Sequence, residues 1–216
     1  MLFTTDYGGA LYANAGTADL DRCTITGNSA LYDGGAVDNE GGAVVFHDCT
    51  LSANTATRGG AAYSTGKITW IECSLSENIA TSSGGALYQI GGEIFWNDCV
   101  LTDNRADDDG AIVSSESNAE TRFDRCVFMG DYDSSACVFF SDDTEPVFMF
   151  CHTIAFASGI VCSASQTAVY NSNISIPMMS SSVMTCQSSD VLDYCGYDCT
   201  DNDATGGITC TCTVDE

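Results

Sequence analysis

Acidic side chains recur at one fixed place in the sequence and are the first candidates for chemistry. Three carboxylates stand immediately before regularly spaced cysteines, with an arginine in that place at either end of the series: Arg22, Asp48, Glu72, Asp98 and Arg125. If the copies stack in a sheet, neighbouring charges lie about 4.8 Å apart and repel one another, which favours a shared cation. Calcium is the candidate, since it prefers several carboxylate oxygens. The simpler interpretation is a solvated charge column with an ion pair at each arginine.

The same acids are the candidates for catalysis. Lyases and hydrolases of polysaccharides use clustered carboxylates near an Arg or Lys. The face that carries Asp48, Glu72 and Asp98 therefore indicates a carbohydrate-binding or carbohydrate-active protein as one alternative. A further acidic run, Asp107-Asp108-Asp109, lies in an expected turn, where solvation is the first interpretation and calcium the second. No residue is assigned a catalytic role, and the sequence favours a protein without enzymatic activity.

Hydroxyl and aromatic side chains form two more outward columns. The hydroxyl pairs are Thr24/Thr26, Thr50/Ser52, Ser74/Ser76 and Val100/Thr102. Regular Thr-x-Thr arrays on flat β-helices are used by ice-binding proteins, so ice binding is a further alternative to an ordinary polar sheet face. The aromatic stripe is Tyr12, Tyr63 and Tyr88, interrupted by Asp38. These rings could stack on sugars, but packing within the protein or against a neighbouring subunit is favoured. Asn173 opens a glycosylation sequon with Ile174 and Ser175.

These residues are positioned by an internal repeat of about 25 residues. Its glycine signature is Gly8-Gly9-Ala10, Gly34-Gly35-Ala36, Gly59-Gly60-Ala61, Gly84-Gly85-Ala86 and, with one change, Asp109-Gly110-Ala111. Its cysteines are Cys23, Cys49, Cys73, Cys99, Cys126 and Cys151. Five positions after the first four cysteines stand Asn28, Asn54, Asn78 and Asn104, and Asp131 takes that place in the fifth unit. Short alternating runs broken by Gly and Asn predict about three strands per unit.

One such unit cannot bury its apolar face, whereas stacked units can. The sequence therefore predicts an all-β fold: a right-handed, single-stranded parallel β-helix of about 6–7 coils over residues 1–178. The asparagines are expected to form a structural ladder, because each amide can bond to the copies above and below. The repeat cysteines are expected to be an inward ladder of free thiols, since stacked Cβ vectors give poor disulfide torsions.

The Gly-Gly-Ala and (Ile/Leu)-x-x-Asn pairs resemble the repeats of polymorphic outer-membrane proteins and related extracellular adhesins. The matching segments are Ile25 to Asn28, Leu51 to Asn54, Leu75 to Asn78 and Leu101 to Asn104, with Phe128 to Asp131 as a degenerate fifth. The resemblance covers residues 1–160 approximately, with Leu or Ile in place of the family's Phe. It implies a β-helical fold, secretion, surface display and adhesion. Other extracellular β-helix repeats fit equally well.

Composition narrows the class of partner. The chain has 216 residues, a formal net charge of -24, 44% hydrophobic residues and 13 cysteines. The hydrophobic fraction predicts a folded chain, and the acidity argues against nucleic acid and anionic membrane surfaces. No apolar run is long enough to span a membrane. An acidic, cysteine-rich chain is typical of extracellular or cell-surface proteins. No signal peptide is visible, so we expect a mature form or a fragment.

The pattern decays after residue 130, and residues 179–216 are expected to form a Cys-rich, disulfide-stabilised C-terminal tail. Tail disulfides are expected among Cys186, Cys195, Cys199, Cys210 and Cys212. Cys137 and Cys162 are the expected disulfide of the β-helix, because both lie in late, irregular coils. No spacing matches a structural zinc site, so no cofactor other than calcium is expected.

The functional prediction is a non-catalytic structural or adhesive protein, possibly a filament subunit. The glycine signature is already in register at Gly8-Gly9-Ala10, and no capping helix or proline-rich segment covers the first coil. An uncapped coil exposes strand edges, which recruit other strands. The expected partners are further copies of the chain, stacked head to tail, or other extracellular proteins and glycans.

Overall fold

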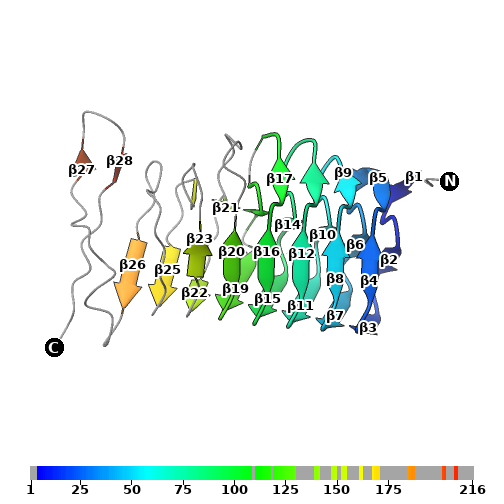
Figure 1. Cartoon of the computed structure of the whole chain (residues 1–216), viewed down its shortest axis with the longest axis horizontal. Helices are drawn as coiled ribbons and strands as arrows, with labels where there is room; N and C mark the ends of the chain where they lie inside the picture. Colours follow the sequence, from blue (N-terminus) through cyan, green and yellow to red (C-terminus); the bar gives the residue numbers. More distant parts are fainter. Residues whose placement is uncertain are drawn as a thin grey trace.

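The computed structural model describes residues 4–108, 110–117 and 119–129, together with the backbone of eight short strands beyond them. Every described element is a β-strand, and no helix occurs among the described residues. The chain winds as a parallel β-solenoid of about five turns, whose strands stack along one axis (Figure 1). Within residues 4–129, partner residues in adjacent turns are 24 to 27 positions apart, as in Phe46 opposite Trp70 and Trp96 opposite Phe123. The predicted all-β parallel β-helix is confirmed.

Each of the first five turns contributes one strand to each of four parallel sheets, which we call A to D. Sheet A holds β1 (Thr4–Tyr7), β5 (Ser29–Asp33), β9 (Thr55–Ala56), β13 (Ile79–Ala80) and β17 (Arg105–Ala106). Sheet B holds β2 (Leu11–Asn14), β6 (Val37–Glu40), β10 (Ala62–Ser64), β14 (Leu87–Ile90), β18 (Val113–Glu116), β21 (Phe139–Ser141) and β24 (Val161–Cys162).

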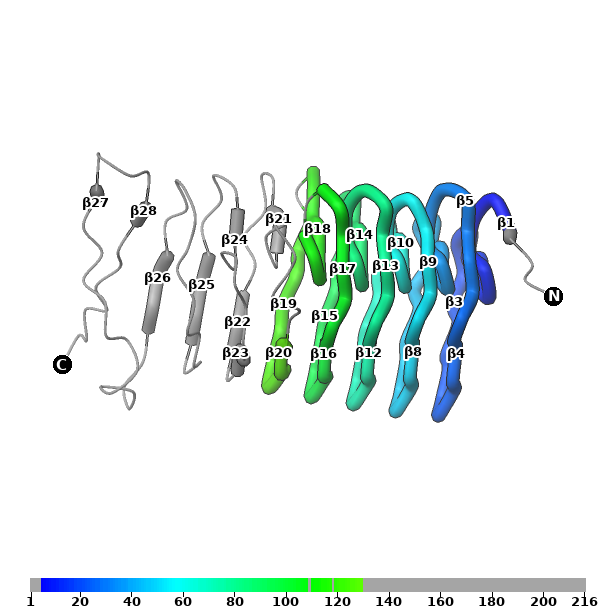
Figure 2. The backbone as a smooth tube through the Cα atoms, turned by 45° about the horizontal axis from the view of Figure 1, so that its top comes forward, coloured from blue at the N-terminus to red at the C-terminus, as the bar shows by residue number. Residues whose placement is uncertain are grey.

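Sheet C holds β3 (Thr17–Asp21), β7 (Ala43–His47), β11 (Lys67–Ile71), β15 (Glu93–Asn97), β19 (Glu120–Asp124), β22 (Val147–Met149), β25 (Thr167–Tyr170) and β26 (Met184–Gln187). Sheet D holds β4 (Thr24–Thr26), β8 (Thr50–Ser52), β12 (Ser74–Ser76), β16 (Val100–Thr102), β20 (Val127–Met129) and β23 (His152–Ile154). A separate antiparallel pair joins β27 (Asp201–Asn202) to β28 (Gly207–Ile208). The prediction of three strands per unit was wrong, because the short segment after each asparagine pairs as a strand of sheet A (Figure 2).

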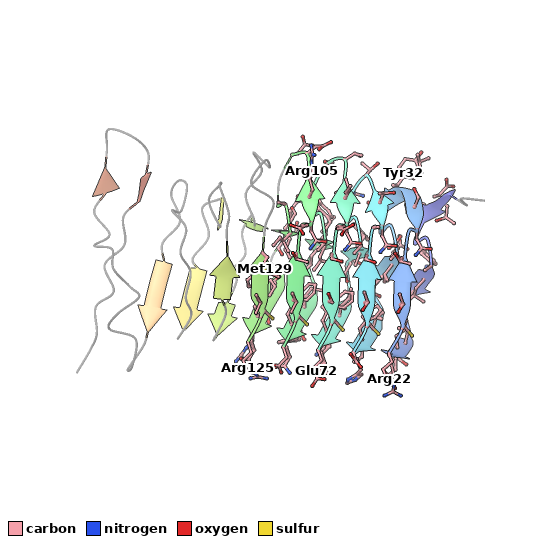
Figure 3. All side chains as sticks on the ribbon, viewed as in Figure 1. Arg22, Tyr32, Glu72, Arg105, Arg125 and Met129 are labelled. Atoms are coloured by element: carbon pink, nitrogen blue, oxygen red, sulfur yellow. The ribbon has the colours of Figure 1, made fainter. Side chains whose placement is uncertain are left out.

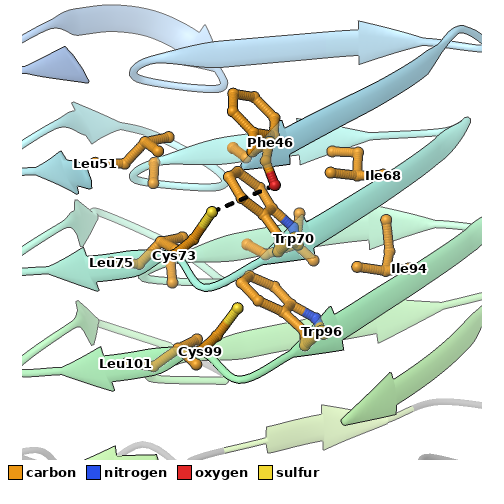
Figure 4. Packing of buried hydrophobic residues seen from close by; sticks show 14 of the residues in the cluster. Phe46, Leu51, Ile68, Trp70, Cys73, Leu75, Ile94, Trp96, Cys99 and Leu101 are labelled. Carbon is orange, nitrogen blue, oxygen red and sulfur yellow. Dashed lines mark hydrogen bonds between the residues drawn. The ribbon is translucent and has the colours of Figure 1, made fainter. Parts of the chain in front are cut away.

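The core is built from columns of identical or similar residues. The aromatic column stacks ring on ring, with centroids 4.1 Å apart for Phe46 and Trp70 and 5.0 Å apart for Trp70 and Trp96 (Figure 4). Beside it runs an aliphatic column in sheet D, which includes Leu51 and Leu75, both fully buried. Because period-two alternation sends every second side chain inward, the four sheets enclose one continuous apolar interior.

The glycine pairs make the corner between sheets A and B. The first glycine of a pair, such as Gly34 with a φ of 61°, lies in the left-handed region that favours glycine. The second has no room for a side chain, since a Cβ on Gly35 would lie 2.1 Å from the carbonyl oxygen of Gly60 in the next turn. The predicted role of the pair, a sharp turn where a Cβ would clash, is confirmed.

The fifth glycine unit is shifted by one residue from its predicted alignment. The sequence aligned Gly110 with the second glycine of the earlier pairs, and Ala111 with the alanine column. In the structure the amide of Ala86 donates to the carbonyl of Ile112, and Gly110 has the positive φ of a first glycine. Ile112 therefore takes the alanine place, and the column predicted to be strictly small ends in a large residue.

The cause of this shift lies at the preceding corner between sheets B and C. Ser64 lies opposite Gln89, 25 positions on, whereas Lys67 lies opposite Glu93, 26 positions on. One residue is thus gained after Gln89, and every later partner in that turn is displaced by it. A match of glycines alone cannot detect such an insertion.

Several predictions from the sequence concern residues beyond 129. The predicted boundary between β-helix and tail falls after residue 178, yet the backbone of β26 pairs in parallel with β25, so sheet C enters the predicted tail. In the backbone register Cys162 lies opposite Phe140. The backbone of Cys186 lies in β26, opposite Val169. The other residues singled out from the sequence beyond this point lie outside the described residues: Asp131, Cys137, Cys151, Asn173, Cys195, Cys199, Cys210 and Cys212. Their pairing and modification stay predictions.

Candidate functional site

The outward charged column lies at the two-residue corner between sheets C and D, where each charged residue is followed by a cysteine of the repeat. All five members, Arg22, Asp48, Glu72, Asp98 and Arg125, have φ values of 50° to 55°. Figure 3 shows Arg22, Glu72 and Arg125 along one edge of the solenoid, with Tyr32 and Arg105 along the opposite edge. All five side chains are exposed. The backbone of this corner thus turns each charged side chain out to solvent.

Only one end of this column carries the expected ion pair between turns. Arg125 donates to both oxygens of Asp98, at 2.7 and 2.8 Å, and also to Asp124 and Asn97. The guanidinium beside Asp98 holds the pKa of that carboxyl below its usual value. At the other end Arg22 pairs with Asp21, its neighbour in sequence, and the pair expected with Asp48 was wrong. The charge of Asp98 is therefore compensated within the protein.

Within the described residues, no three His, Cys, Asp or Glu side chains gather closely enough to hold a metal ion. Asp48, Glu72 and Asp98 are stacked but do not converge. In the second acidic run, Asp107 pairs with Arg105 and Asp108 accepts a hydrogen bond from Ser82, while Asp109 lies outside the described residues. This part of the chain therefore contains no preformed set of ligands for the predicted calcium ion.

The asparagines form a hydrogen-bonded ladder through the interior. The Oδ1 atom of Asn78 accepts bonds from the backbone amide and the Nδ2 atom of Asn54, at 3.1 and 3.0 Å. The Nδ2 atom of Asn78 in turn donates to Asn104 and to the carbonyl of Leu51. The same pattern begins at Asn28. Each amide both accepts and donates, so the column satisfies itself and offers no open ligand position.

The cysteines form a second internal ladder. Cys49, Cys73, Cys99 and Cys126 are buried, Cys23 is half-buried, and all five are free thiols. They donate to backbone carbonyls, as Cys73 does to Phe46 in Figure 4. Burial raises the pKa of the Cys49 thiol. These thiols fill the space between the aromatic and aliphatic columns rather than acting as ligands.

The hydroxyl pairs lie on the outer face of sheet D, as their alternation predicts. Its strands pair in register, with Thr24 opposite Thr50, Thr50 opposite Ser74 and Ser74 opposite Val100. The hydroxyl of Ser52 donates to that of Thr26 at 3.0 Å. This gives a regular, partly exposed polar surface over the first four turns.

The aromatic stripe lies on sheet B and continues into smaller residues. In register it reads Tyr12, Asp38, Tyr63, Tyr88 and Ser114, which we call the tyrosine column. Tyr63 and Tyr88 are buried and stack with their ring centroids 5.9 Å apart, whereas Tyr12 is exposed. The buried pair cannot present its faces to a sugar, which leaves packing against the coil as the role of these two rings.

Arg58 covers the tyrosine column and was not singled out from the sequence. Its guanidinium lies 5.3 Å from the Tyr63 ring and 5.1 Å from the Tyr88 ring, a cation–π arrangement. It also makes a two-pronged ion pair with buried Asp33, at 2.7 and 2.8 Å. One of the six basic residues of the chain is thus committed to this site.

Asp38 is the unusual member of the tyrosine column. Its exposed fraction is 0%, and neither carboxylate oxygen has a hydrogen-bond partner. Burial, followed by the charges of Glu40 and Asp33, raises its pKa to about 7, against the opposing effect of Arg58. The break that Asp38 makes in the tyrosine stripe was the only signal in the sequence, and alternation alone placed it on an outer, solvated face.

Comparison with known proteins gives no relative for this chain. No family model, curated protein or solved structure matches it. No helix long and apolar enough to cross a membrane occurs among the described residues. The structure therefore supports only the fold implied by the resemblance to outer-membrane repeats, the parallel β-solenoid. Common ancestry and a shared activity are not inferred from it.

Proposed function

We propose that the protein is a non-catalytic, extracellular structural or adhesive β-solenoid that associates end to end through its first turn. One observation carries this proposal, namely that the first described turn leaves the ends of the core columns partly uncovered. Leu11, Leu20 and Ile25 are half-buried. Their partners in the second turn, such as Phe46 opposite Leu20, are fully buried.

Strand edges and aromatic side chains add to this surface. Among the described residues, no strand pairs with the outer edges of β2, β3 and β4. Four of the five exposed large hydrophobic side chains lie in β1, β2 and β5: Tyr7, Tyr12, Leu31 and Tyr32. Free edges beside apolar surface recruit another strand, and a head-to-tail contact that does not close produces a filament.

The test is the mass of the full-length chain over a wide concentration range by sedimentation. We expect larger species as concentration rises, and we expect Leu20→Asp to abolish them. Ile79→Asp is the matched control, because Ile79 is an exposed apolar residue of an interior turn. A wild-type chain that stays monomeric at high concentration would overturn the proposal. Circular dichroism checks that both variants are folded.

Glycan binding is the second candidate, and one observation favours it. Tyr7 and Tyr32 are exposed and lie 5.6 Å apart, a pair of rings able to stack on a sugar. Binding to a panel of acidic and neutral polysaccharides, lost in Tyr32→Ser, would support this function. Hydrolysis or cleavage of any of them, lost in Glu72→Gln, would establish the carbohydrate-active alternative. No response to any glycan would leave self-association as the function.

Ice binding is a third candidate, supported by the regular hydroxyl face of sheet D. The pairs Thr24/Thr26 and Thr50/Ser52 repeat in register in adjacent turns. Thermal hysteresis that is lost in Thr26→Tyr would support it, because a bulky ring would break the flat surface. An unchanged freezing point in the presence of wild-type protein would exclude this candidate.

A further inference from the structure

The tyrosine column contains a buried acid that has no hydrogen-bond partner among the described residues. Asp38 is fully buried on β6, and both its oxygens lack a hydrogen-bond partner. Its neighbour Val37 points into the core. Alternation along the strand therefore puts the Asp38 side chain on the opposite, outer face of sheet B. A buried carboxylate without partners is costly as an ion, and protonation is its usual response.

The groups that face Asp38 do not supply the missing charge. Tyr12 faces it from β2, Tyr63 from β10, Asp33 from the end of β5 and Glu40 from its own strand, and Arg58 is the one cation. The Arg58 guanidinium is already bound to both oxygens of Asp33. Glu40 and Asp33 are acids and repel a second negative charge.

The side chains that cover Asp38 from its two neighbouring turns are packed to different extents. On the side of the third turn, Tyr63 stacks on Tyr88 and both rings lie against Arg58. On the side of the first turn, Tyr12 is 48% exposed, and its hydroxyl is held by a hydrogen bond of 2.6 Å to Glu40. In a repeat protein each turn contacts only its neighbours, so the turn whose covering side chain is half in solvent opens at the lower cost. We therefore expect the first turn, rather than the third, to move away from Asp38.

We propose that Asp38 is a proton-controlled latch for the first turn of the solenoid. When Asp38 holds a proton, the segment from Gly8 to Asn14 lies closed over it. When Asp38 loses the proton, this segment lifts from β6 and the carboxylate reaches water. The proton goes to solvent, and no other group has to change its charge.

The direction of the effect follows from proton linkage. The pKa of Asp38 is about 7 in the closed form, against an ordinary value of 3.8 when the side chain meets water. The closed form therefore binds the proton more tightly and is favoured at low pH. Opening increases by up to about tenfold per pH unit as the pH rises from about 4 to about 7, and is constant above that.

Hydrogen–deuterium exchange of the full-length chain measures this opening directly. Protection of the amides from Gly8 to Asn14 is followed from acid to neutral pH, with the rates corrected for intrinsic exchange. We expect wild-type protection to fall through this window and then to level off. Asp38→Asn removes the titrating group, and we expect its protection to be independent of pH. Asp48→Asn is the matched control, since Asp48 is an exposed acid of the same turn, and it should behave as the wild type.

The same pH dependence in Asp38→Asn as in the wild type would overturn the latch. Should Asp38→Asn fold poorly, Asp38→Ser is the second variant, because Ser114 occupies the same column three turns later. Protection from Gly8 to Asn14 that is already absent at acid pH would equally contradict the proposal. These outcomes do not depend on self-association, since exchange can be measured at concentrations where the chain is monomeric.

Discussion

The asparagine ladder and Asp38 are two buried polar sites of this solenoid. They differ in whether their buried polar atoms have hydrogen-bond partners. Asn78 and Asp38 both have exposed fractions of 0%. Every Asn78 amide atom is hydrogen-bonded, whereas neither Asp38 oxygen is. An amide donates and accepts, so a stack of identical amides satisfies itself, while a carboxylate can only accept. Repetition stabilises a polar residue when that residue is complementary to its own copy.

Breaking the ladder at its centre should give the largest effect. Asn78→Ala removes the acceptor of the Asn54 backbone amide and one of the two acceptors of Asn54 Nδ2. It also removes the side-chain donor to the Leu51 carbonyl and one of the two donors to the Asn104 oxygen. Because buried unpaired groups each cost about 1–3 kcal/mol, we expect a loss of about 4 kcal/mol in the free energy of unfolding. Urea denaturation measures it. Asn28→Ala, at the half-buried end, should cost clearly less, and equal losses would contradict the ladder.

Removing the cation beside Asp38 should have the next largest effect. Arg58→Met leaves buried Asp33 without its ion pair. Loss of a buried partner costs several kcal/mol, and we expect about 2–3 kcal/mol because the Arg58 side chain is 37% exposed. Lys67→Met, which removes an exposed ion pair with Glu93, is the control. In an Asp33→Asn background the Arg58→Met loss should shrink, and an undiminished loss would rule out the ion pair as its cause.

Replacing Asp38 with asparagine should raise the free energy of unfolding at neutral pH but not in acid. The folded state holds the proton up to a pKa of about 7 and the unfolded chain only up to about 3.8, so stability is lost as the pH rises between them. At pH near 8 we expect Asp38→Asn to raise the free energy of unfolding by about 2 kcal/mol, since opening of the first turn limits the cost of the charge. At pH near 4 the difference should vanish. Urea denaturation at the two pH values checks the sign.

The backbone beside an asparagine rung should respond more weakly than the rung itself. Ala53 precedes Asn54 with a φ of 53°, where Gly27 stands one turn earlier. Ala53→Gly relieves left-handed strain but adds entropy to the unfolded chain, for a net gain of about 0.5–1 kcal/mol. Thermal unfolding measures it. The reverse change, Gly27→Ala, should lower the transition temperature, and a gain in both variants would contradict this explanation.

An exposed polar column should respond least of all. Arg125→Met removes the bonds to Asp98 and Asp124 at the surface, where water replaces them. We expect a small fall in the urea midpoint at low ionic strength that disappears at about 1 M salt, where exposed charges are screened. A large loss that survives high salt would mean that this column, like the asparagine ladder, stabilises the fold.

The repeat made most of this fold predictable. The inward places of Trp70, Leu75 and Cys73 follow from the period and the alternation, because stacked copies must share one environment. The same reasoning places Asn78 beside its copies and Glu72 in solvent. A residue type that recurs in every turn indicates whether its column is buried or exposed, because all copies of the column share one environment.

Residues present in a single copy were not predictable in this way. Asp38, Asp33 and Arg58 occur once in their columns, and their contacts depend on the corner between sheets A and B closing over the outer face of sheet B. Alternation tells which side of a strand a residue is on, but not whether something covers that side. The candidate latch was therefore visible only as an interruption of the tyrosine stripe.

The corner between sheets B and C varies in length from turn to turn. Three residues separate Asn39 from the first residue of sheet C, two follow Ser64 and four follow Ser115. The ladders on either side keep their partners despite these differences. This corner therefore tolerates inserted residues, and a foreign peptide could be displayed there once per turn. The fixed spacing of the stacked strands would then set the distance between the displayed copies.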